Sequence, residues 1–283
     1  MYPAFSKWIH SHRDLPFKVN QWSNVVRWEF KHPTPFIRTR EFLWQEGHTA
    51  HATEDCATSF VMSILDQYAR CYEELLAVPV VKGRKSEEET FAGAYFTTTT
   101  EIYVPVSGRG IQGATSHQLG QNFAKMFDIW FEDKKGGKAN CWQTSWGLST
   151  RSIGAMIMVH SDDKGLVLPP RVAQNQVVII PILKKGDDFE AIGAKAEELF
   201  QMLKKGGIRV ELDDRDHYNP GWKFNHWEQR GVPIRLELGA KDFAAEEVRC
   251  CKRRDGAKMQ LKQSNLLADV QKLLEDIHTE MFN

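Results

Sequence analysis

Apolar runs of strand length and amphipathic runs of helix length alternate in the second part of this chain, and their alternation is the feature that most constrains the fold. Val177–Ile182 is almost entirely apolar, as expected of a buried strand. Residues 188–205 follow with apolar side chains at helical spacing, and Gly206 with Gly207 is a typical helix stop. The alternation predicts a three-layer α/β module with a mixed sheet. The further elements expected are strands at 208–212 and 234–238, a short helix at 221–229, a hairpin at 248–261 that turns at Asp255 and Gly256, and a helix at Leu266–Phe282.

A break at residues 168–174 separates this module from a first part that is richer in glycine and in loops. Pro169 and Pro170 interrupt regular structure there. We therefore expect two domains, residues 1–173 and residues 174–283.

The first part is expected to be an antiparallel sheet with flanking helices, an α+β arrangement. Strands are predicted at 78–81 and within the alternating run 95–106. Thr53 is placed to cap a helix. The apolar residues of that helix recur at helical spacing and are expected in the core: Cys56, Phe60, Ile64, Leu65, Tyr68 and Leu75.

Composition narrows the class of protein. The chain carries 37 basic and 37 acidic residues, and this balance argues against indiscriminate binding to nucleic acid. Two basic clusters, residues 82–85 and 252–254, could contact phosphates, although solvated lysines and arginines explain them equally well. The five cysteines lack CxxC spacing, so we expect reduced thiols with neither disulfides nor zinc. No signal peptide or membrane-spanning apolar run is recognised, which predicts a soluble cytoplasmic protein with no membrane partner.

Charged and bulky residues alternate within residues 25–48, which predict two strands joined by a loop. In the first run Arg27 and Glu29 alternate with Trp28 and Phe30, so a strand would place a guanidinium and a carboxylate on one face. Such a face could bind a phosphate and an amine together. From these residues alone, an ordinary cross-strand ion pair on a solvated face is the better explanation.

Two further segments, IQGATSHQLGQNF (residues 111–123) and NCWQTSWGLSTRSIG (residues 140–154), change that balance. Together with residues 25–48 they resemble the catalytic core of prolyl-tRNA synthetase, a class II aminoacyl-tRNA synthetase. The runs VPVVKGRKSEEETFAGA, VHSDDKGLVLPPRVA and PGWKFNHWEQRGVPIRLELG are similar to the eukaryotic and archaeal branch of that family, so the resemblance covers essentially the whole chain. It implies a class II synthetase-like antiparallel sheet with helices in residues 1–173 and an anticodon-binding domain in residues 174–283.

The resemblance also implies a reaction, namely ATP-dependent activation of L-proline to prolyl-adenylate and transfer of proline to tRNA(Pro). Arg27 and Arg151 match the arginines of the second and third signature motifs and are the expected catalytic residues. Arg27 would bridge the α-phosphate and the amino-acid carboxylate, a task suited to a planar donor of permanent charge. Mg²⁺ is expected on the phosphates, with no ligand residues assigned. The ATP-binding residues implied are Arg27, Glu29, Arg38, Phe42, Gln112, Thr115, Ser149 and Arg151.

Two parts of this ATP site have alternative explanations. Phe42 would offer a flat face to adenine, but core packing explains an isolated phenylalanine about as well. Residues 147–150 would present backbone N–H groups at the start of an apolar helix at 153–159, where anions are favoured. Without the resemblance, GLSTR is above all a generic helix cap.

The proline pocket is expected to combine an aromatic wall with polar groups, as a small apolar ring requires. A histidine such as His117, taken alone, is more often a hydrogen-bonded core residue than a ligand contact. With the resemblance, His117 is expected to contact the ligand instead. The proline-binding residues implied are Arg27, Trp44, Glu46, His48, Phe91, His117, Ser145 and Gly147.

The chain departs from the family pattern at both ends. Family members carry Thr-Ser-Glu-Thr just before the segment MYPAFSKW, together with the first signature motif and the dimer-forming elements, so we expect an N-terminally incomplete chain of an enzyme that is a homodimer when intact. A cysteine-bearing C-terminal domain is also missing, so zinc is not expected. The alternative to an enzyme is a catalytically silent tRNA-binding or regulatory fragment. Residues 221–224 and their neighbours would suffice for its contacts with tRNA.

Overall fold

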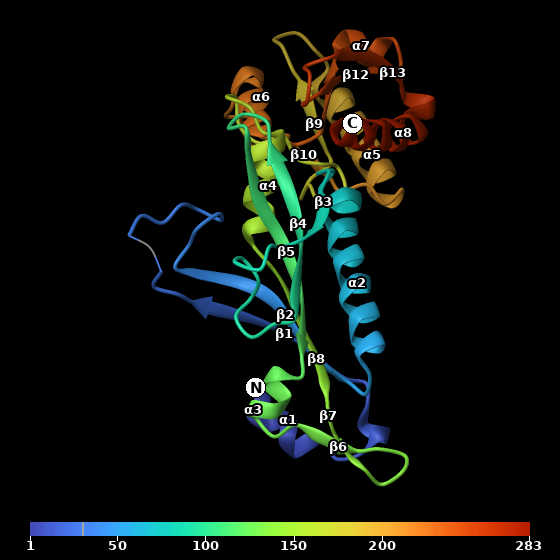
Figure 1. Cartoon of the computed structure of the whole chain (residues 1–283). Coiled ribbons are helices and arrows are strands. Elements are labelled where there is room, and N and C mark those ends of the chain that lie inside the picture. The colour runs from blue at the N-terminus through green and yellow to red at the C-terminus, as the bar shows by residue number, and fades with distance from the viewer. Residues whose placement is uncertain (30) are drawn as a thin grey trace. The chain divides into compact units, whose positions relative to one another are not determined.

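The computed structural model describes residues 1–29 and 31–283, which form two compact units. Unit 1 comprises Met1–Glu74 and Pro79–Ala155, and unit 2 comprises Leu75–Val78 and Met156–Asn283. Each unit is built on its own sheet, as Figure 1 shows. In the part of the chain that the structure describes, no helix is both long and apolar enough to cross a membrane.

The sheet of unit 1 has six strands in the order β1-β2-β8-β5-β4-β3, and every neighbouring pair is antiparallel. This confirms the predicted antiparallel sheet. The strands are β1 (Phe17–Val26), β2 (Glu41–His51), β3 (Val81–Arg84), β4 (Phe96–Val104), β5 (Arg109–Gly120) and β8 (Trp142–Ser149), and a separate small ribbon pairs β6 (Trp130–Glu132) with β7 (Lys138–Asn140). The short helices are α1 (Tyr2–Trp8), η1 (His12–Asp14) and α3 (Asn122–Met126).

The long helix α2 (Glu54–Arg70) lies along one face of this sheet and continues into a π-helical turn at Cys71–Leu75. Its start is as predicted, because the Thr53 hydroxyl accepts a hydrogen bond from the Cys56 amide. Its expected core is wrong in part. Leu65 and Tyr68 are buried, but Cys56 and Leu75 are exposed, and Phe60 and Ile64 are half-buried. The buried stripe runs instead through the smaller residues Ala57 and Val61, which allow the helix to approach the sheet closely.

Two strand predictions in unit 1 need correction. The first predicted strand was to carry Arg27 and Glu29, yet β1 ends at Val26, and the Arg27 amide makes one further bond to the Arg40 carbonyl at 2.7 Å. The connection to β2 contains Pro33 and Pro35, which have no amide hydrogen to extend a ladder. Phe30 lies outside the described residues. The strand expected at 78–81 begins only at Val81, and Pro79 again removes a donor.

Unit 2 has a five-stranded mixed sheet with helices on both faces. β9 (Val177–Ile182) lies between two parallel neighbours, β10 (Val210–Leu212) and β11 (Ile234–Gly239), and β12 (Glu247–Lys252) and β13 (Lys258–Lys262) complete the sheet in antiparallel fashion. The helices are α4 (Arg151–His160), which leads into this unit, α5 (Phe189–Lys205), α6 (Pro220–Gln229), α7 (Ala240–Ala244), η3 (Gln263–Asn265) and α8 (Leu266–Phe282).

The side chains of β9 explain why helices cover both faces of this sheet. Val177 and Ile179 pack with apolar residues of α5 and α8. Val178 and Ile180 point to the other face, where they pack with Phe224 and Trp227 of α6. A strand that is buried on both faces reads as a continuous apolar run. The predicted three-layer α/β module is confirmed, with boundaries within about two residues for most of its elements. The five-residue helix α7 was not predicted.

Candidate functional site

Two hollows lie on the sheet of unit 1. The larger, the aromatic pocket, has a volume of about 490 Å³ and is lined by Trp44, Glu46, His48, Phe91, Gln112, Thr115, His117, Ser145 and Gly147, among others. The smaller, the arginine pocket, has a volume of about 260 Å³ and is lined by Glu29, Phe36, Ile37, Arg38 and Thr39, among others. Arg27, Phe42, Ser149 and Arg151 line both hollows. Every residue that the sequence analysis assigned to ATP or to proline therefore lies in one hollow or the other.

Strand register brings the polar side chains of the aromatic pocket together. Side chains alternate between the two faces of a strand, so Trp44, Glu46 and His48 of β2 share the pocket face. In the antiparallel ladders, Ser145 of β8 lies opposite His48 on one side and opposite His117 of β5 on the other. Three adjacent strands thus contribute one row of polar side chains across the pocket floor.

A chain of hydrogen bonds runs along one wall of the aromatic pocket. The Tyr2 hydroxyl lies 3.1 Å from Nδ1 of His48, and Nε2 of that ring lies 2.9 Å from Oε1 of Glu46. Gln21 of β1 donates to the other carboxylate oxygen at 2.7 Å. The hydrogen bond from His48 is the main reason that the pKa of Glu46 is lowered, and burial raises the pKa of Tyr2. Glu46 is therefore a carboxylate and Tyr2 a neutral phenol at neutral pH.

His117 forms the opposite wall and is a neutral hydrogen-bonding group. Its Nδ1 lies 2.9 Å from the Thr97 hydroxyl, and its ring lies 5.0 Å from that of Phe91. Burial, helped by the positive charge of Lys85, lowers the pKa of His117 to about 4. Glu46 is a half-buried carboxylate among polar and aromatic groups, whereas the second carboxylate of the pocket lining, Glu89, is 70% exposed and lies 3.7 Å from Lys85. The surroundings of Glu46 suit a small ligand with an apolar ring and a cationic amine.

Three arginines dominate the arginine pocket. The Arg151 Nε donates to the Ile37 carbonyl at 2.9 Å, and burial followed by the charge of Arg38 lowers the pKa of Arg151. The Arg27 guanidinium lies 5.4 Å from the ring centres of both Phe42 and Trp44. Guanidinium groups that share a hollow create a positive potential suited to phosphate oxygens.

The backbone around Gly147 differs from the expectation. Residues 147–149 belong to β8, in which Gly147 and Leu148 are paired with both β2 and β5 and Ser149 with β2. The Thr150 amide donates to the Leu43 carbonyl at 3.0 Å, and the Arg151 amide donates to the Ser149 hydroxyl at 3.3 Å. The expectation that this segment offers backbone N–H groups to an anion is therefore wrong, because the sheet and the helix cap use them. Gly147 instead leaves open space beside Trp44, since a Cβ there would lie 3.6 Å from that ring.

The aromatic pocket is also lined by residues that were not assigned from the sequence, among them Tyr2, Lys85, Thr97 and Phe123. Lys85 donates to Oε1 of Gln112 at 2.7 Å, although its sequence context indicated only a surface cluster. Thr97 belongs to a run of four threonines, in which nothing distinguishes the one that faces the pocket. Long-range contacts alone place these residues.

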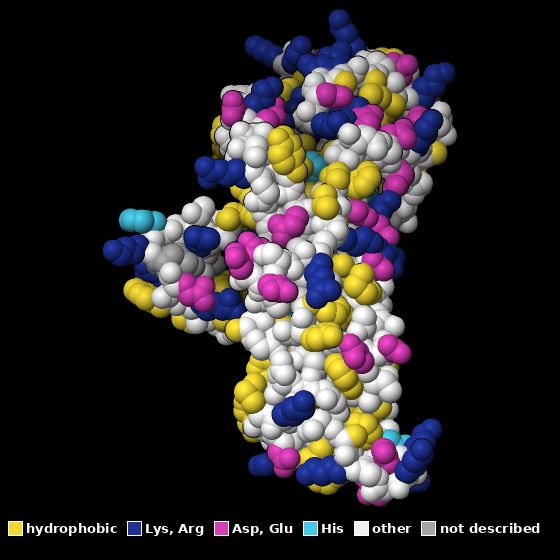
Figure 2. Space-filling model, viewed as in Figure 1, with side chains coloured by type: hydrophobic (Ala, Val, Ile, Leu, Met, Phe, Trp, Pro, Cys, Tyr) yellow, Lys and Arg dark blue, Asp and Glu magenta, His cyan; other side chains and the backbone are white. Residues whose placement is uncertain are grey.

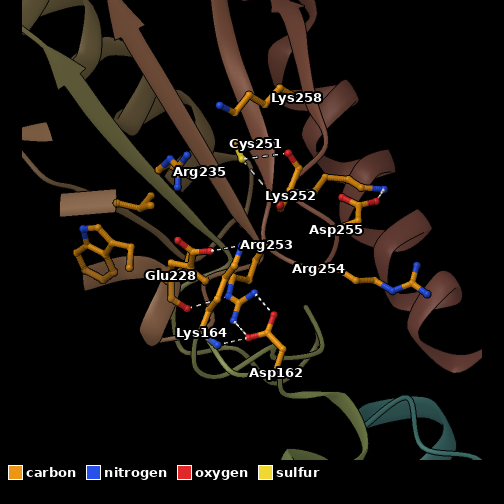
Figure 3. A pocket seen from close by; sticks show the side chains of 14 residues that line it. Asp162, Lys164, Glu228, Arg235, Cys251, Lys252, Arg253, Arg254, Asp255 and Lys258 are labelled. Carbon is orange, nitrogen blue, oxygen red and sulfur yellow. Dashed lines mark hydrogen bonds and ion pairs between the residues drawn. The ribbon is translucent and has the colours of Figure 1, made fainter. Parts of the chain in front are cut away.

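Unit 2 contains a third hollow, of about 350 Å³, which we call the basic pocket (Figure 3). Arg253 forms a two-pronged pair with Asp162 at 2.8 and 2.6 Å and donates to the Glu228 carbonyl at 2.8 Å. This pairing lowers the pKa of Asp162 to about 2. The Lys252 ammonium lies 3.0 Å from Glu280 and 3.2 Å from Asp255. On the visible face of unit 2, Lys and Arg side chains lie beside Asp and Glu (Figure 2).

Residues 221–224, which were predicted to contact tRNA, divide into buried and exposed members. Lys223 is buried and donates to the Asp213 carbonyl at 2.9 Å, so its ammonium has a structural partner. Trp222 is 38% exposed and stacks on Tyr218, with ring centres 3.7 Å apart. The exposed part of this segment is therefore aromatic rather than cationic.

No group of three or more His, Cys, Asp or Glu side chains that could hold a metal ion occurs among residues 1–29 and 31–283. All five cysteines are free thiols. Burial raises the pKa of Cys141 and of Cys250 to about 12, so these two remain protonated and inert.

Comparisons with known proteins agree with this geometry. Residues 1–160 match the tRNA synthetase class II core domain (G, H, P, S and T), and residues 176–273 match the anticodon binding domain. The chain is 56% identical to cytoplasmic proline-tRNA ligase of Arabidopsis thaliana over 100% of its own length and 53% of that protein. It is 56% identical to the bifunctional glutamate/proline-tRNA ligase of Mus musculus, of which it covers 19%.

A solved structure gives the same result. Prolyl-tRNA synthetase of Cryptosporidium parvum, complexed with L-proline and AMP, has a TM-score of 0.97 to this chain at 56% identity. The match covers 100% of this chain and 58% of that one, so this chain spans about half the length of these single-function relatives. The two hollows of unit 1, the fold of both units and these matches establish that the chain belongs to the class II aminoacyl-tRNA synthetases and, within them, to the prolyl-tRNA synthetase family.

Proposed function

We propose that this chain carries the site at which ATP activates L-proline to prolyl-adenylate, and that it takes part in transfer of proline to tRNA(Pro). The observation that carries the proposal is the adjacency of the two hollows, one rich in arginine and the other holding the half-buried Glu46 carboxylate among aromatic rings. Activation joins two anions, the amino-acid carboxylate and the α-phosphate, so it requires positive charge between them.

Arg27 is the residue that we assign to this junction. It lines both hollows, so one guanidinium can face the carboxylate on one side and the phosphate on the other. Its planar fork can donate to both anions at once. Arg151 also lines both hollows, and Arg38 lies on the arginine side only, where the terminal phosphates would lie. Phe42 and Glu29 would receive the adenine, with Gln112, Thr115 and Ser149 near the ribose and phosphates.

Proline would occupy the aromatic pocket. Trp44 and Phe91 would enclose its ring, and Glu46 would face its secondary amine, which is a cation at neutral pH. His48, His117, Ser145 and Gly147 would complete the enclosure. Mg²⁺ would arrive with the ATP phosphates. It is a hard cation that usually keeps several waters and few protein ligands, so the lack of a ready carboxylate cluster in the described residues is compatible with this role.

The second unit would bind the anticodon region of tRNA(Pro), and we propose residues 1–173 and 174–283 as the functional division of the chain. Trp222 and Arg254 are better candidates for contact with RNA than Lys223 or Arg253, because the latter two are buried and paired. By similarity to the cytoplasmic relative we also propose a cytoplasmic location. From the family resemblance of the sequence we propose that the intact enzyme is a homodimer.

The test is proline-dependent exchange of labelled pyrophosphate into ATP, with alanine in place of proline as the control. It is run on this chain and on a form extended upstream by the Thr-Ser-Glu-Thr segment of the relatives. Exchange that requires proline in either form supports the proposal. Absence of exchange in both forms, with tRNA(Pro) still bound, would contradict it and favour the silent RNA-binding alternative.

A further inference from the structure

Among the described residues that line the aromatic pocket, the half-buried Tyr2 carries a hydroxyl that the proposed reaction does not use. Tyr2 belongs to the short helix α1, far in sequence from the strands that form the pocket floor. Its oxygen lies 3.1 Å from Nδ1 of His48, which lies 2.9 Å from Glu46 through its other nitrogen. The hydroxyl thus reaches the pocket carboxylate through one imidazole ring.

The protonation of the two end groups determines the tautomer of the ring between them. Glu46 is ionised and can only accept hydrogen bonds, because the bond from His48 lowers its pKa. The hydrogen between the ring and Glu46 must therefore be on Nε2. Burial, followed by the charge of Glu46, raises the pKa of Tyr2, so its phenol keeps a proton that it can donate to Nδ1. In this arrangement each donor among Tyr2, His48 and Glu46 has an acceptor.

We propose that Tyr2 is a positioning residue: its hydroxyl holds His48 in the tautomer with hydrogen on Nε2, and this hydrogen holds the Glu46 carboxylate in place for the substrate amine. The part concerning the substrate rests on the function proposed above. The part concerning the tautomer and the carboxylate does not, because it concerns only the free protein.

The position of the Tyr2 ring does not depend on its hydroxyl. The ring packs against those of Phe5, Phe123 and Phe127 at centroid distances of 5.8, 5.2 and 5.7 Å, and it meets the His48 ring edge-on at 5.5 Å. Such aromatic contacts hold the ring by themselves. Substitution by phenylalanine therefore removes one oxygen atom and leaves the ring where it is.

The other charged and titratable groups around His48 are few. Glu46 adjoins it on β2, and the charge of Arg27 acts on Glu46. His117 of β5 is a neutral ring, and the positive charge of Lys85 acts on it. Gln21 fixes the second oxygen of Glu46 at 2.7 Å but does not touch the ring. Glu46 and Tyr2 thus distinguish the two nitrogens of His48 together: the carboxylate favours hydrogen on Nε2, and the hydroxyl adds to that preference by donating to Nδ1.

The experiment compares Tyr2→Phe with Tyr103→Phe, which removes the same atom from an exposed tyrosine of β4. Nitrogen-15 NMR of the His48 ring is expected to show a single tautomer, with hydrogen on Nε2, in the parent and the control. In Tyr2→Phe it should show both tautomers. A carbon-13 titration of the Glu46 carboxylate should show a raised midpoint in Tyr2→Phe only, because the bond that lowers its pKa is weakened.

The functional readout is the KM for proline in pyrophosphate exchange. Loss of one net hydrogen bond corresponds to about a three- to tenfold increase in KM, with little change in kcat or in the KM for ATP. A parent with hydrogen on Nδ1, or the same tautomer in Tyr2→Phe and its parent, would overturn the proposal. So would an altered tautomer with an unchanged Glu46 titration. Parent protein without exchange activity would count against the proposed function alone, since both NMR readouts would still decide the inference.

Discussion

The cationic side chains of the two units have different partners. In unit 1, Arg151 donates to a backbone carbonyl and Arg27 lies over two aromatic rings, so the partners seen for these two groups are neutral. In unit 2, Arg253 and Lys252 face the carboxylates of Asp162 and Glu280. A neutral partner orients a guanidinium without cancelling its charge. A carboxylate orients the guanidinium and also cancels its charge. The first arrangement prepares a charge for a ligand, and the second stabilises the fold.

Arg27→Ala tests the unit 1 side of this comparison and has the largest expected effect. Removing one preorganised donor to developing charge lowers kcat by about 10²- to 10³-fold. Arg27→Lys should recover part of this loss, because it keeps the charge but not the planar fork. Pyrophosphate exchange measures the effect, and thermal unfolding should be unchanged. Arg109→Ala, at an exposed position of β5, is the matched control. A loss of tRNA affinity in parallel with activation would refute the separation of roles between the units.

Arg253→Met tests the unit 2 side. The substitution removes the guanidinium that pairs with Asp162 and removes the hydrogen bond to the Glu228 carbonyl. Breaking a fully buried pair costs about 3–5 kcal/mol, and because Asp162 is partly exposed we expect about 2 kcal/mol of lost unfolding free energy. Urea denaturation followed by circular dichroism measures this loss. Proline activation should be unaffected. If stability were unchanged and tRNA binding failed, Arg253 would be a ligand contact and the comparison would be wrong.

The same contrast shows what could be predicted from the sequence. Most elements of unit 2 were predicted closely because β9 is buried on both faces, so it forms an uninterrupted apolar run, and because Gly206 and Asp255-Gly256 mark a helix end and a turn. The extent of β1 was mispredicted because none of its side chains is fully buried, so burial imposes no regular pattern on its sequence. Short elements such as α1, α3 and α7 contain too few residues to show a period.

For the pockets, residue type and spacing were sufficient only together with the family resemblance. The alternation of Trp44, Glu46 and His48 is visible in the sequence, and β2 places all three on the pocket face. The contributions of Tyr2 and Lys85 depend on contacts 46 and 27 residues away along the chain, which no local pattern encodes. Likewise, the sequence shows a cluster of basic residues at 252–254, but only the fold reveals that two of them are paired and buried.

The dependence of stability on acid pH tests the stabilising role of the Asp162–Arg253 pair in unit 2. Because Arg253 lowers the folded-state pKa of Asp162 to about 2, below the ordinary value of 3.8, this pair stabilises the fold above about pH 4. The contribution should be lost as the pH falls from about 4 towards 2, and solvent screening limits it to about 1 kcal/mol. The measurement is the difference in unfolding free energy between parent and Asp162→Asn at each pH. This difference should shrink as the pH falls below 4 and approach zero only below pH 2, where Asp162 is protonated in the folded state as well. A difference that stayed constant would show that Asp162 does not titrate through this pair.

Arg254→Gln has the smallest expected effect and decides which member of the basic cluster is open to RNA. Its guanidinium lies 2.9 Å from Glu280, but both side chains are about two-fifths exposed. Exposed pairs contribute between zero and about 1 kcal/mol, so stability should fall by less than about 0.5 kcal/mol. Titration with tRNA(Pro) at two salt concentrations is the informative measurement. A weaker affinity with a smaller salt dependence would identify Arg254 as a phosphate contact, because one fewer cation would then be released on binding. Unchanged binding would mean that the whole cluster, exposed member included, is structural, and that the RNA contacts of unit 2 lie with the aromatic face of α6 instead.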